Sequence, residues 1–236
     1  VTYEGNGPAP GSSQEVPHSL GSVPGLMIVK RSNNESNWFV YHKGLGADST
    51  INLDQPWGAQ SPALQWASTE PTSSNFYVGG GGEVCGAGDS YVAYLFADTP
   101  GLIKCGKKTF TGSDNTAEFG FRAEWVLMKN VDATENWFIY DTTQGQDQVL
   151  NPNTTDPSQS TADISFSASG IVYNKLGTYI YVAIAENAMG DSFPPSGTLT
   201  ADADNSGPTM TLTDVKGTWE NGMKAVSYTH LTLPTN

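Results

Sequence analysis

The sequence predicts an all-β protein: an antiparallel β-sandwich of the jelly-roll or lectin-like kind, built from two tandem related units. Gly and Pro are abundant, with 26 and 14 residues, which is expected where many short strands are joined by tight turns. Long windows with apolar residues at helical spacing and without Gly or Pro are missing, so long helices are not expected. Segments of the first half recur in the second half, which indicates an internal repeat.

The repeat is clearest in a short aromatic segment, Asn-Trp-Phe-[Val/Ile]-Tyr, that occurs twice. It occupies residues 37–41 and, 99 residues later, residues 136–140. The preceding apolar segments, residues 25–30 and 124–129, match at the same offset. Two matches in one register are not expected by chance, so we interpret the chain as two copies of one β unit.

The end of each copy is marked by a Tyr-rich apolar run. Residues 91–97 match residues 181–185 at an offset of 90, so the second copy is expected to lack about nine residues. Because loops tolerate changes in length better than strands do, we expect the deletion in the tract that corresponds to residues 50–88. A weaker similarity between residues 2–6 and 109–113 marks the start of each copy.

Each copy is predicted to contain, in order, a short strand, a turn, a strand with Lys near its end, a loop, the Trp-Phe strand, a variable loop and the Tyr-rich strand. Along the Trp-Phe strand, residues 38–41, side chains alternate between two faces, and both faces are apolar. This pattern predicts a strand that is buried on both sides, with its aromatic side chains packed in the core.

We divide the chain where this pattern changes. Residues 1–104 form the first unit, residues 105–192 the second unit, residues 193–224 a linker and the start of a further β module, and residues 225–236 a tail that resembles translated sequencing-adapter read-through. That tail is excluded from the functional interpretation. The chain starts at Val1 without an initiator Met or a leader, so we interpret it as a fragment or a processed product.

The charge pattern disfavours nucleic acid and membranes as partners. The formal net charge is −13 and is spread along the chain, whereas nucleic-acid binding needs clustered Lys and Arg. Anionic membrane surfaces are disfavoured for the same electrostatic reason. The longest apolar runs have seven residues, far fewer than the roughly 20 that span a bilayer. We therefore expect no nucleic-acid partner and no membrane insertion.

Catalytic and metal-binding patterns are weak. No Gly-x-Ser-x-Gly segment is present to carry a nucleophile, so no catalytic residue is predicted. Cys85 and Cys105 lack metal-ligand spacing and are interpreted as free thiols, with one disulfide as the open alternative. Glu35 and Glu135 precede the Trp-Phe strands and are interpreted as solvated turn residues. Residues 202–207 resemble the start of a calcium loop without its closing Glu, so a polar turn is expected, with no metal and no cofactor.

The longer variable tract of the first unit contains the candidate ligand-binding residues Trp57, Trp66, Tyr77 and Asp54. The corresponding residues 151–162 of the second unit hold no aromatic cluster, so these side chains are freer to serve a ligand. The apolar face of Trp stacks on sugar rings, and Asp54 can accept hydrogen bonds from sugar hydroxyl groups. The alternative is that these aromatics only hold the long loop in place as a small additional core.

Residues 17–30, followed by residues 37–42, resemble a repeated domain found in tail and tail-fibre proteins of marine phages. The second copy carries the matching Trp-Val-Leu-Met-Lys and Asn-Trp-Phe-Ile-Tyr segments, so the resemblance covers roughly residues 1–190. The second copy departs from the family pattern at residues 116–119, where Thr-Ala-Glu-Phe replaces Pro-His-Ser-Leu.

The resemblance implies a structural protein of the phage virion, a tail or tail-fibre component that is not an enzyme. It implies other tail proteins as partners, a homo-oligomeric state, a location in the virion tail that is extracellular when the protein acts, and contact with a host-surface glycan. Two alternatives stay open: a secreted carbohydrate-binding or adhesin module, and a polysaccharide depolymerase.

Overall fold

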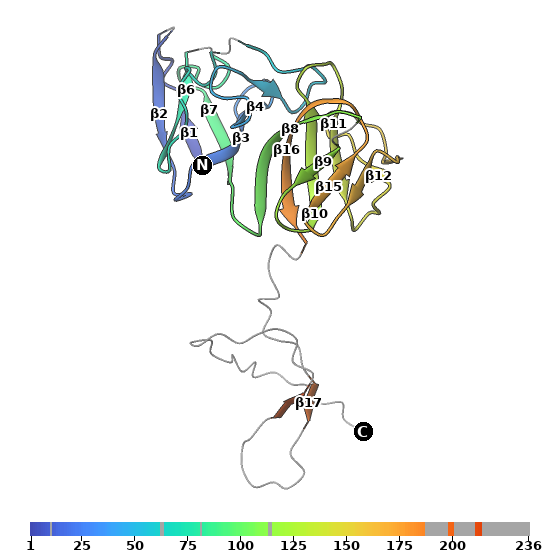
Figure 1. Cartoon of the computed structure of the whole chain (residues 1–236). Coiled ribbons are helices and arrows are strands. Elements are labelled where there is room, and N and C mark those ends of the chain that lie inside the picture. The colour runs from blue at the N-terminus through green and yellow to red at the C-terminus, as the bar shows by residue number, and fades with distance from the viewer. Residues whose placement is uncertain are drawn as a thin grey trace, which may run out of the picture. The chain divides into compact units, whose positions relative to one another are not determined.

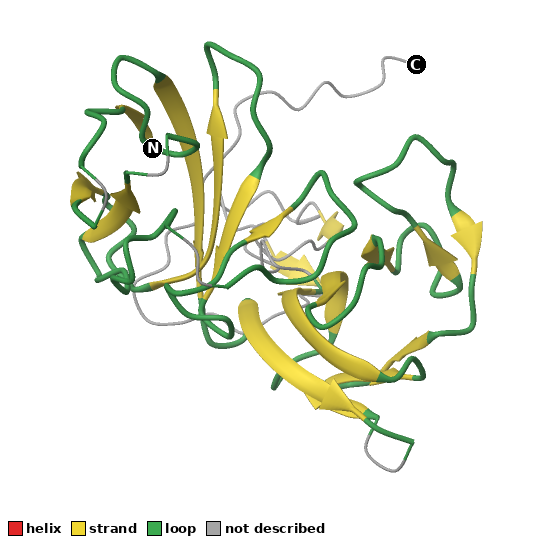
Figure 2. Cartoon of the chain, turned by 90° about the horizontal axis from the view of Figure 1, so that it is seen from above, coloured by secondary structure: helices red, strands yellow, loops and turns green. Residues whose placement is uncertain are grey.

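The computed structural model describes residues 1–186, apart from residues 10, 62–63, 81 and 113–114, together with the strands β17 (Thr198–Thr200) and β18 (Thr211–Thr213). The chain divides into two compact units, Val1–Glu186 and Asn187–Asn236. We call the first unit the β body. Its regular elements are all strands in antiparallel sheets, and the described residues contain no helix (Figure 2), so the all-β prediction is confirmed.

The segments predicted as a further β module and a tail, residues 193–224 and 225–236, lie outside the described residues except for β17 and β18, which pair antiparallel. The predicted polar turn at residues 202–207 also lies outside them. Within the described part of the chain, no helix is long and apolar enough to cross a membrane.

The first half of the β body contains a large sheet and a small sheet. Their strands are β1 (Thr2–Glu4), β2 (Ser13–Pro17), β3 (Pro24–Arg31), β4 (Phe39–His42), β5 (Ile51–Asn52), β6 (Asn75–Gly79) and β7 (Ser90–Ala97). The large sheet has the order β1-β7-β3-β4-β5, and the small sheet pairs β2 with β6.

The second half also contains a large sheet with a smaller sheet. Its strands are β8 (Ile103–Phe110), β9 (Thr116–Glu118), β10 (Ala123–Asn130), β11 (Trp137–Asp141), β12 (Gln148–Val149), β13 (Gln159–Ser160), β14 (Ile164–Phe166), β15 (Gly170–Tyr173) and β16 (Gly177–Ala185). The large sheet has the order β11-β10-β16-β8, the smaller sheet has the order β14-β15-β9, and β12 pairs with β13.

The strand pairing of the first half recurs in the second half. β3 lies between β4 and β7, and β10 lies between β11 and β16 in the same way. Each pairing has a β-bulge at the same point, at Gly25 in β3 and at Glu124 in β10. A bulge adds one unpaired residue and fixes a bend, so its recurrence means that the two halves share local backbone geometry as well as sequence.

The strand register corrects the offset expected at the end of the repeat. Tyr91 pairs with Arg31, whereas Tyr179 pairs with Asn130, which lies 99 residues after Arg31. Tyr91 therefore corresponds to Tyr179, and not to Tyr181 as the local Tyr-Val-Ala similarity indicates. The offset is 88, so the second copy is eleven residues shorter and not nine. A shift of two residues along a strand leaves every side chain on the same face of the sheet. The apolar pattern therefore fits both alignments, and sequence similarity alone did not reveal the two-residue error.

Each large sheet packs one face against the smaller sheet of its own half. In the first half the buried cluster includes Met27, Tyr41, Trp66, Phe76 and Tyr91. In the second half it includes Phe110, Met128, Tyr140, Tyr173 and Tyr179. Both halves thus have the two-layer packing expected of a β-sandwich.

The other faces of the two large sheets pack against each other. A third buried cluster joins residues of both halves, among them Leu26, Val40, Ile51, Leu127, Trp137 and Ile180. The β body is therefore layered as small sheet, large sheet, large sheet, small sheet (Figure 1). The sequence left open whether the two units share one core, and the structure contains such a core. It also confirms that the Trp-Phe strand is buried on both sides, since Phe39–His42 are all buried.

The predicted boundary between residues 104 and 105 lies inside β8, whose residues pair with β16 from Ile103 to Phe110. By its pairing, β8 belongs entirely to the second half. The sequence left open whether each half folds by itself. Cys85 and Cys105 are free and buried in different clusters, the first half's own core and the central core.

Candidate functional site

The predicted ligand residue Asp54 has a structural role. Its Oδ1 accepts a hydrogen bond from the backbone N–H of Trp38 at 3.0 Å. The amide oxygen of Asn153 accepts the same bond from Trp137 at 2.9 Å, 99 residues later. The repeated Asn-Trp-Phe segment is therefore held by an acceptor sixteen residues further on in both halves.

Trp66 is not available to a ligand, because its side chain is fully buried. Its ring packs edge-on against Tyr41, with the ring centroids 5.9 Å apart, inside the core of the first half. The Nε1 of Trp66 has no hydrogen-bond partner among the described residues. This corrects the prediction: for Trp66, the additional-core interpretation holds.

Trp57 and Tyr77 lie on opposite sides of the first large sheet. Tyr77 is half-buried in β6, opposite Glu15 of β2, in the small sheet. Trp57 lies in the loop after β5, which contacts the second half. The four residues predicted as a ligand site therefore do not form a single site.

Trp57 is the exposed member of the predicted set, with 47% of its surface accessible. Its loop is fixed on both sides: the carbonyl of Pro56 accepts a bond from the N–H of Glu135 at 2.8 Å, and the N–H of Ala59 donates to the carbonyl of Val131 at 2.8 Å. The indole is thus presented to solvent from a loop that is anchored on the second half.

A polar pocket of about 530 Å³ lies at the end of β3. It is lined by Lys30, Glu35, Ser36, Asn37 and Glu83. The Nζ of Lys30 donates to the carbonyl of Ser36 and lies 5.9 Å from the centre of the Trp38 ring. The pocket thus combines an ammonium group, two carboxylates and an amide, which can exchange hydrogen bonds with hydroxyl groups.

The pocket is connected to the loop that carries Trp57. The Nε2 of Gln55 donates to the Oδ1 of Asn37 at 3.4 Å, and Asp54 bonds the adjacent residue Trp38. A polar pocket and an exposed indole therefore belong to neighbouring, hydrogen-bonded segments of the first half.

Glu135 is not the solvated turn residue that the sequence predicted. One carboxylate oxygen accepts a bond from Lys175 at 2.7 Å, and the other accepts a bond from the hydroxyl of Tyr179 at 2.8 Å. Burial alone raises the pKa of Glu135, but these donors lower it to a net value below the ordinary one. Glu35, the other residue of the pair, is exposed as predicted.

Two buried basic side chains join the halves. The Nδ1 of His42 accepts a bond from the N–H of Gly44, and its Nε2 lies 3.1 Å from the carbonyl of Tyr181, so the neutral ring donates to Tyr181. Burial lowers the pKa of His42 to about 4. The Nζ of Lys129 donates to the carbonyls of Pro56 and Asn130 at 3.2 and 2.7 Å, and burial lowers its pKa to about 8.

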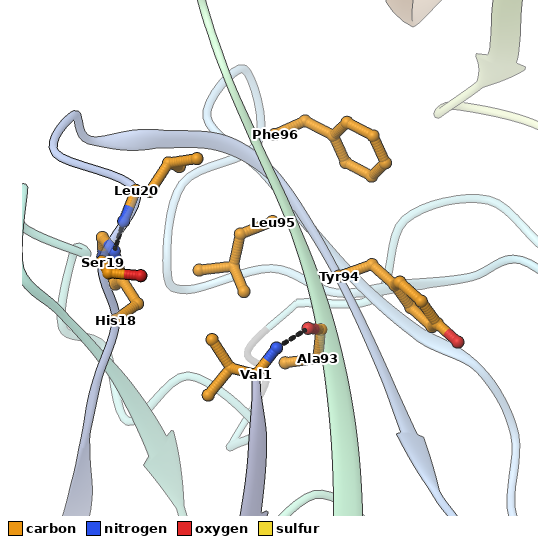
Figure 3. Close-up of a pocket in the computed structure, with 8 residues that line it drawn as sticks. All are labelled: Val1, His18, Ser19, Leu20, Ala93, Tyr94, Leu95 and Phe96. Carbon is orange, nitrogen blue, oxygen red and sulfur yellow. Dashed lines mark hydrogen bonds between the residues drawn. The ribbon is translucent and has the colours of Figure 1, made fainter.

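An apolar groove of about 350 Å³ was not predicted from the sequence. It lies beside β7 and is lined by Val1, His18, Ser19, Leu20 and residues 93–96 (Figure 3). Tyr94, Val1 and Leu20 are among the large apolar residues of the chain that are exposed. The apolar run at residues 91–97 was a signal for it, because Tyr94, in the middle of that run, stays exposed in the folded chain.

Both ring nitrogens of His18 are engaged in the wall of this groove. Its Nε2 lies 3.1 Å from the carbonyl of Thr72, and its Nδ1 accepts a bond from the N–H of Leu20 at 3.2 Å. The imidazole therefore holds the segment of residues 18–20 in place. Elsewhere too, the described residues contain no group of three or more His, Cys, Asp or Glu side chains placed to hold a metal ion.

These features define a layered β protein whose first half carries a polar pocket and an apolar groove on its surface. Residues 1–188 match the family described as Domain of unknown function (DUF7483), and the chain belongs to that family. The match spans the whole β body. No curated protein and no solved structure matches the chain.

Proposed function

We propose that the protein is a structural component of a phage tail or tail fibre, which acts by assembly and contacts a host-surface glycan. The proposal rests on the resemblance of residues 1–190 to tail proteins. The observation that carries it is the shared core between the two halves. Because packed cores resist deformation, a body of this kind holds its surface loops at fixed positions and is suited to a virion appendage.

Hydrogen bonds across the shared core support the same role. The Nε1 of Trp137 donates to the carbonyl of Asn52 at 2.7 Å, and His42 bonds the carbonyl of Tyr181. These bonds are buried, so breaking them leaves polar groups without partners and costs free energy. The two halves therefore move as one piece.

Contact with a glycan is supported by the polar pocket and by the exposed indole of Trp57, whose loop is hydrogen-bonded to the pocket through Gln55 and Asn37. Sugars offer hydroxyl groups and apolar ring faces, and sites for them combine polar side chains with aromatic surfaces. Lys30, Asn37 and Glu83 supply the polar part, and Trp57 supplies an exposed aromatic ring.

Binding to a panel of bacterial surface polysaccharides tests the glycan contact. Trp57→Ala and Glu83→Gln are expected to weaken binding about tenfold, which corresponds to roughly 1.4 kcal/mol. Leu176→Ala is the matched control, because Leu176 is an exposed apolar residue of the second half. Binding that all three variants retain would exclude the pocket and the indole from the contact.

Immunogold labelling of phage particles that carry the gene tests the virion role. Antibodies against this chain are expected to label the tail. Purified particles without label, from a culture that expresses the protein, would contradict the proposal. A leader peptide on the complete gene would then favour the secreted adhesin module.

A depolymerase is the second candidate, and one observation favours it. Glu35 and Glu83 line the same pocket, and glycoside hydrolysis uses two carboxyl groups on either side of the scissile bond. Release of reducing sugar from a host polysaccharide, abolished by both Glu35→Gln and Glu83→Gln, would establish this activity. Binding without release would leave the protein a glycan-contacting structural component.

A further inference from the structure

One contact between the two halves is made in a single direction. Residues 52–59 of the first half, which we call the covering loop, lie against the second half. The carbonyl of Pro56 in this loop accepts one hydrogen bond from the N–H of Glu135 at 2.8 Å and another from the Nζ of Lys129 at 3.2 Å. The second half thus holds an amide carbonyl of the first half with two donors.

The first half has the same two donors without this partner. At the repeat offset of 99 residues, Lys129 and Glu135 correspond to Lys30 and Ser36. The N–H of Ser36 has no hydrogen-bond partner among the described residues, and the Nζ of Lys30 donates to the carbonyl of Ser36 instead. Both residues line the polar pocket of about 530 Å³. The pocket therefore lies where the second half holds the carbonyl.

The repeated Trp shows the same difference. The Nε1 of Trp137 donates to the carbonyl of Asn52, a second carbonyl of the covering loop, at 2.7 Å. Its counterpart Trp38 is half-buried beside Lys30, and within the described part of the chain its Nε1 has no hydrogen-bond partner. The first half thus presents, unpaired, the donors that the second half uses to hold the covering loop.

A loop of the same length in the second half does not return the contact. Val149 pairs with Gln159 just as Thr50 pairs with Gln60, 99 residues earlier. Residues 151–158 therefore correspond to the covering loop. As far as the chain is described, no hydrogen bond joins them to the polar pocket.

One residue of this second loop explains why the pocket stays uncovered. A Cβ atom at Gly58 would lie 2.8 Å from the carbonyl of Val131, so the covering loop comes this close only without a side chain at position 58. The counterpart of Gly58 is Pro157, whose ring would occupy that space. The polar pocket is thus the uncovered copy of a site that binds amide carbonyls in the second half.

The groups that line the pocket select the kind of ligand. The N–H of Ser36 and the ammonium group of Lys30 suit a carbonyl oxygen. The carboxylates of Glu35 and Glu83 accept hydrogen bonds from N–H and hydroxyl groups, and they disfavour an acidic ligand. A protein loop offers carbonyl and N–H groups, but an N-acetylated amino sugar offers both together with several hydroxyl groups on one ring. The pocket therefore fits such a sugar better.

We propose that the polar pocket binds N-acetylated amino sugars of a host-surface glycan. The N–H of Ser36 and the ammonium group of Lys30 hold the acetamido carbonyl, as their counterparts hold the carbonyl of Pro56. A carboxylate of the pocket accepts the acetamido N–H, and the Nε1 of Trp38 donates to a hydroxyl group of the same sugar. This inference rests on the proposed glycan contact and adds the class of sugar to it.

The test compares sugars that differ in one substituent. Methyl glycosides of N-acetylglucosamine and N-acetylgalactosamine are titrated into the ¹⁵N-labelled whole chain, and so are those of glucose and galactose, which carry a hydroxyl group instead of the acetamido group. We expect saturable shifts of the Ser36 amide and Trp38 indole signals, with an acetylated sugar bound at least about tenfold more tightly than its hydroxyl analogue. The Glu135 amide and Trp137 indole signals are the internal controls, because these covered counterparts are expected not to shift.

A variant of the protein tests the ammonium group separately. Lys30→Met keeps an unbranched side chain but removes the charged donor, and it is expected to weaken binding of the acetylated sugar about tenfold. Lys107→Met is the matched control, because Lys107 is an exposed lysine of β8 that does not line the pocket. Thermal unfolding of both variants shows whether they are folded. A folded Lys30→Met variant with full affinity would contradict the assigned role of Lys30.

Three results would overturn the proposal. The first is an absence of saturable Ser36 shifts with both acetylated sugars. The second is equal or tighter binding of the hydroxyl analogues, or of the glucosamine glycoside, whose free ammonium group would pair with the carboxylates. The third is tighter binding of a peptide with the sequence of residues 52–59, which would make a protein loop the occupant.

Failure of this inference is distinguishable from failure of the proposed function. A surface polysaccharide without N-acetyl groups that binds, and that Trp57→Ala weakens, would leave the glycan contact standing and overturn only the class of sugar. Ser36 shifts with an acetylated sugar, without binding of any host polysaccharide, would support the sugar site and contradict the contact with a host-surface glycan.

Discussion

Trp38 and Trp137 occupy equivalent positions of the repeat, yet their indoles have different surroundings. Trp137 is buried in the central core, and its Nε1 donates to the carbonyl of Asn52 across the two halves. Trp38 is only half-buried, beside the ammonium group of Lys30. The two Trp side chains therefore have different structural roles: Trp137 links the two halves through a buried hydrogen bond, whereas Trp38 lies partly exposed beside Lys30.

This difference predicts unequal effects of one substitution. Trp137→Phe removes the 2.7 Å bond to the buried carbonyl of Asn52, which keeps only the longer bond from the N–H of Gln55 at 3.4 Å, and is expected to lower the free energy of unfolding by about 1 kcal/mol. Trp38→Phe, the matched change, is expected to cost less, because Trp38 loses no buried hydrogen bond. Urea unfolding of both variants measures the difference, and equal losses would show that the bond to Asn52 contributes little.

His42 predicts a pH dependence of stability. Unfolded His binds a proton near pH 6.5, whereas burial lowers the pKa of folded His42 to about 4. Between these values a falling pH favours the unfolded state, so stability present at neutral pH is lost as the pH falls. The expected loss is about 2 kcal/mol between about pH 7.5 and about pH 5.

Urea unfolding of the wild type and of His42→Gln at both pH values measures this effect. The Gln amide can still donate to the carbonyl of Tyr181 but does not titrate, so the variant is expected to lose most of the pH dependence. Lys43, Lys107 and Asp98 also act on His42 and are unchanged in the variant. His18→Gln is the control, and a similar flattening of its pH profile would contradict the assignment.

The burial or the structural role of some residues could be predicted from the sequence, and that of others could not. The burial of residues 39–41 was predictable, because alternation along a strand is a local property. The burial of Trp66 was not, because it depends on packing against Tyr41, which is distant in sequence. The role of Asp54 had a signal that was missed: Asn52 and Asp54 recur as Asn151 and Asn153 at the repeat offset.

At the scale of the element, the strand β8 depends on the absence of a side chain at Gly106. A Cβ there would lie 2.3 Å from the ring of Tyr181. Gly106→Ala is expected to lower the free energy of unfolding by about 1–3 kcal/mol, the usual cost of overpacking. Gly112→Ala is the control, because a Cβ there would meet nothing within 4 Å. Thermal unfolding compares them, and equal stability would show that the Tyr181 ring moves aside freely.

The order of the main strands was predicted well, but their number and register were not: four strands were predicted in each copy, whereas the first half has seven and the second half has nine. The strand, loop and Trp-Phe strand of each copy follow from apolar runs and turn residues. The two-residue error at the end of the repeat arose because a similar triplet, Tyr-Val-Ala, occurs in both copies at slightly different positions. Only the pairing of β7 with β3 and of β16 with β10 fixes the register.

At the scale of the whole β body, the shared core predicts how a single half behaves. Residues 1–102 end before β8, and without the second half they expose the apolar face that contains Leu26, Val40 and Ile51. Exposed apolar patches of this kind drive association. We therefore expect the 1–102 fragment to aggregate or self-associate, whereas residues 1–186 are expected to unfold in a single transition.

Size-exclusion chromatography with light scattering, followed by thermal unfolding, tests this expectation on both fragments. A monomeric 1–102 fragment with a sharp transition would show that the first half is stable without the central core. The sequence indicated the two copies, but not that the first half depends on the second half for its stability. Both faces of the Trp-Phe strand are apolar, so the sequence does not show which face packs in the central core.

The central core has one further consequence, which concerns the origin of the chain. Leu26 and Val40 in the first half and their counterparts, Trp125 and Ile139, all contribute to it, so each copy uses the same face. A contact between equal faces is the kind that forms in a two-fold symmetric dimer of one small protein. Fusion of two duplicated genes would make such a contact intramolecular, and therefore independent of concentration. Each copy could then diverge, as Ala93 and Tyr181 have done.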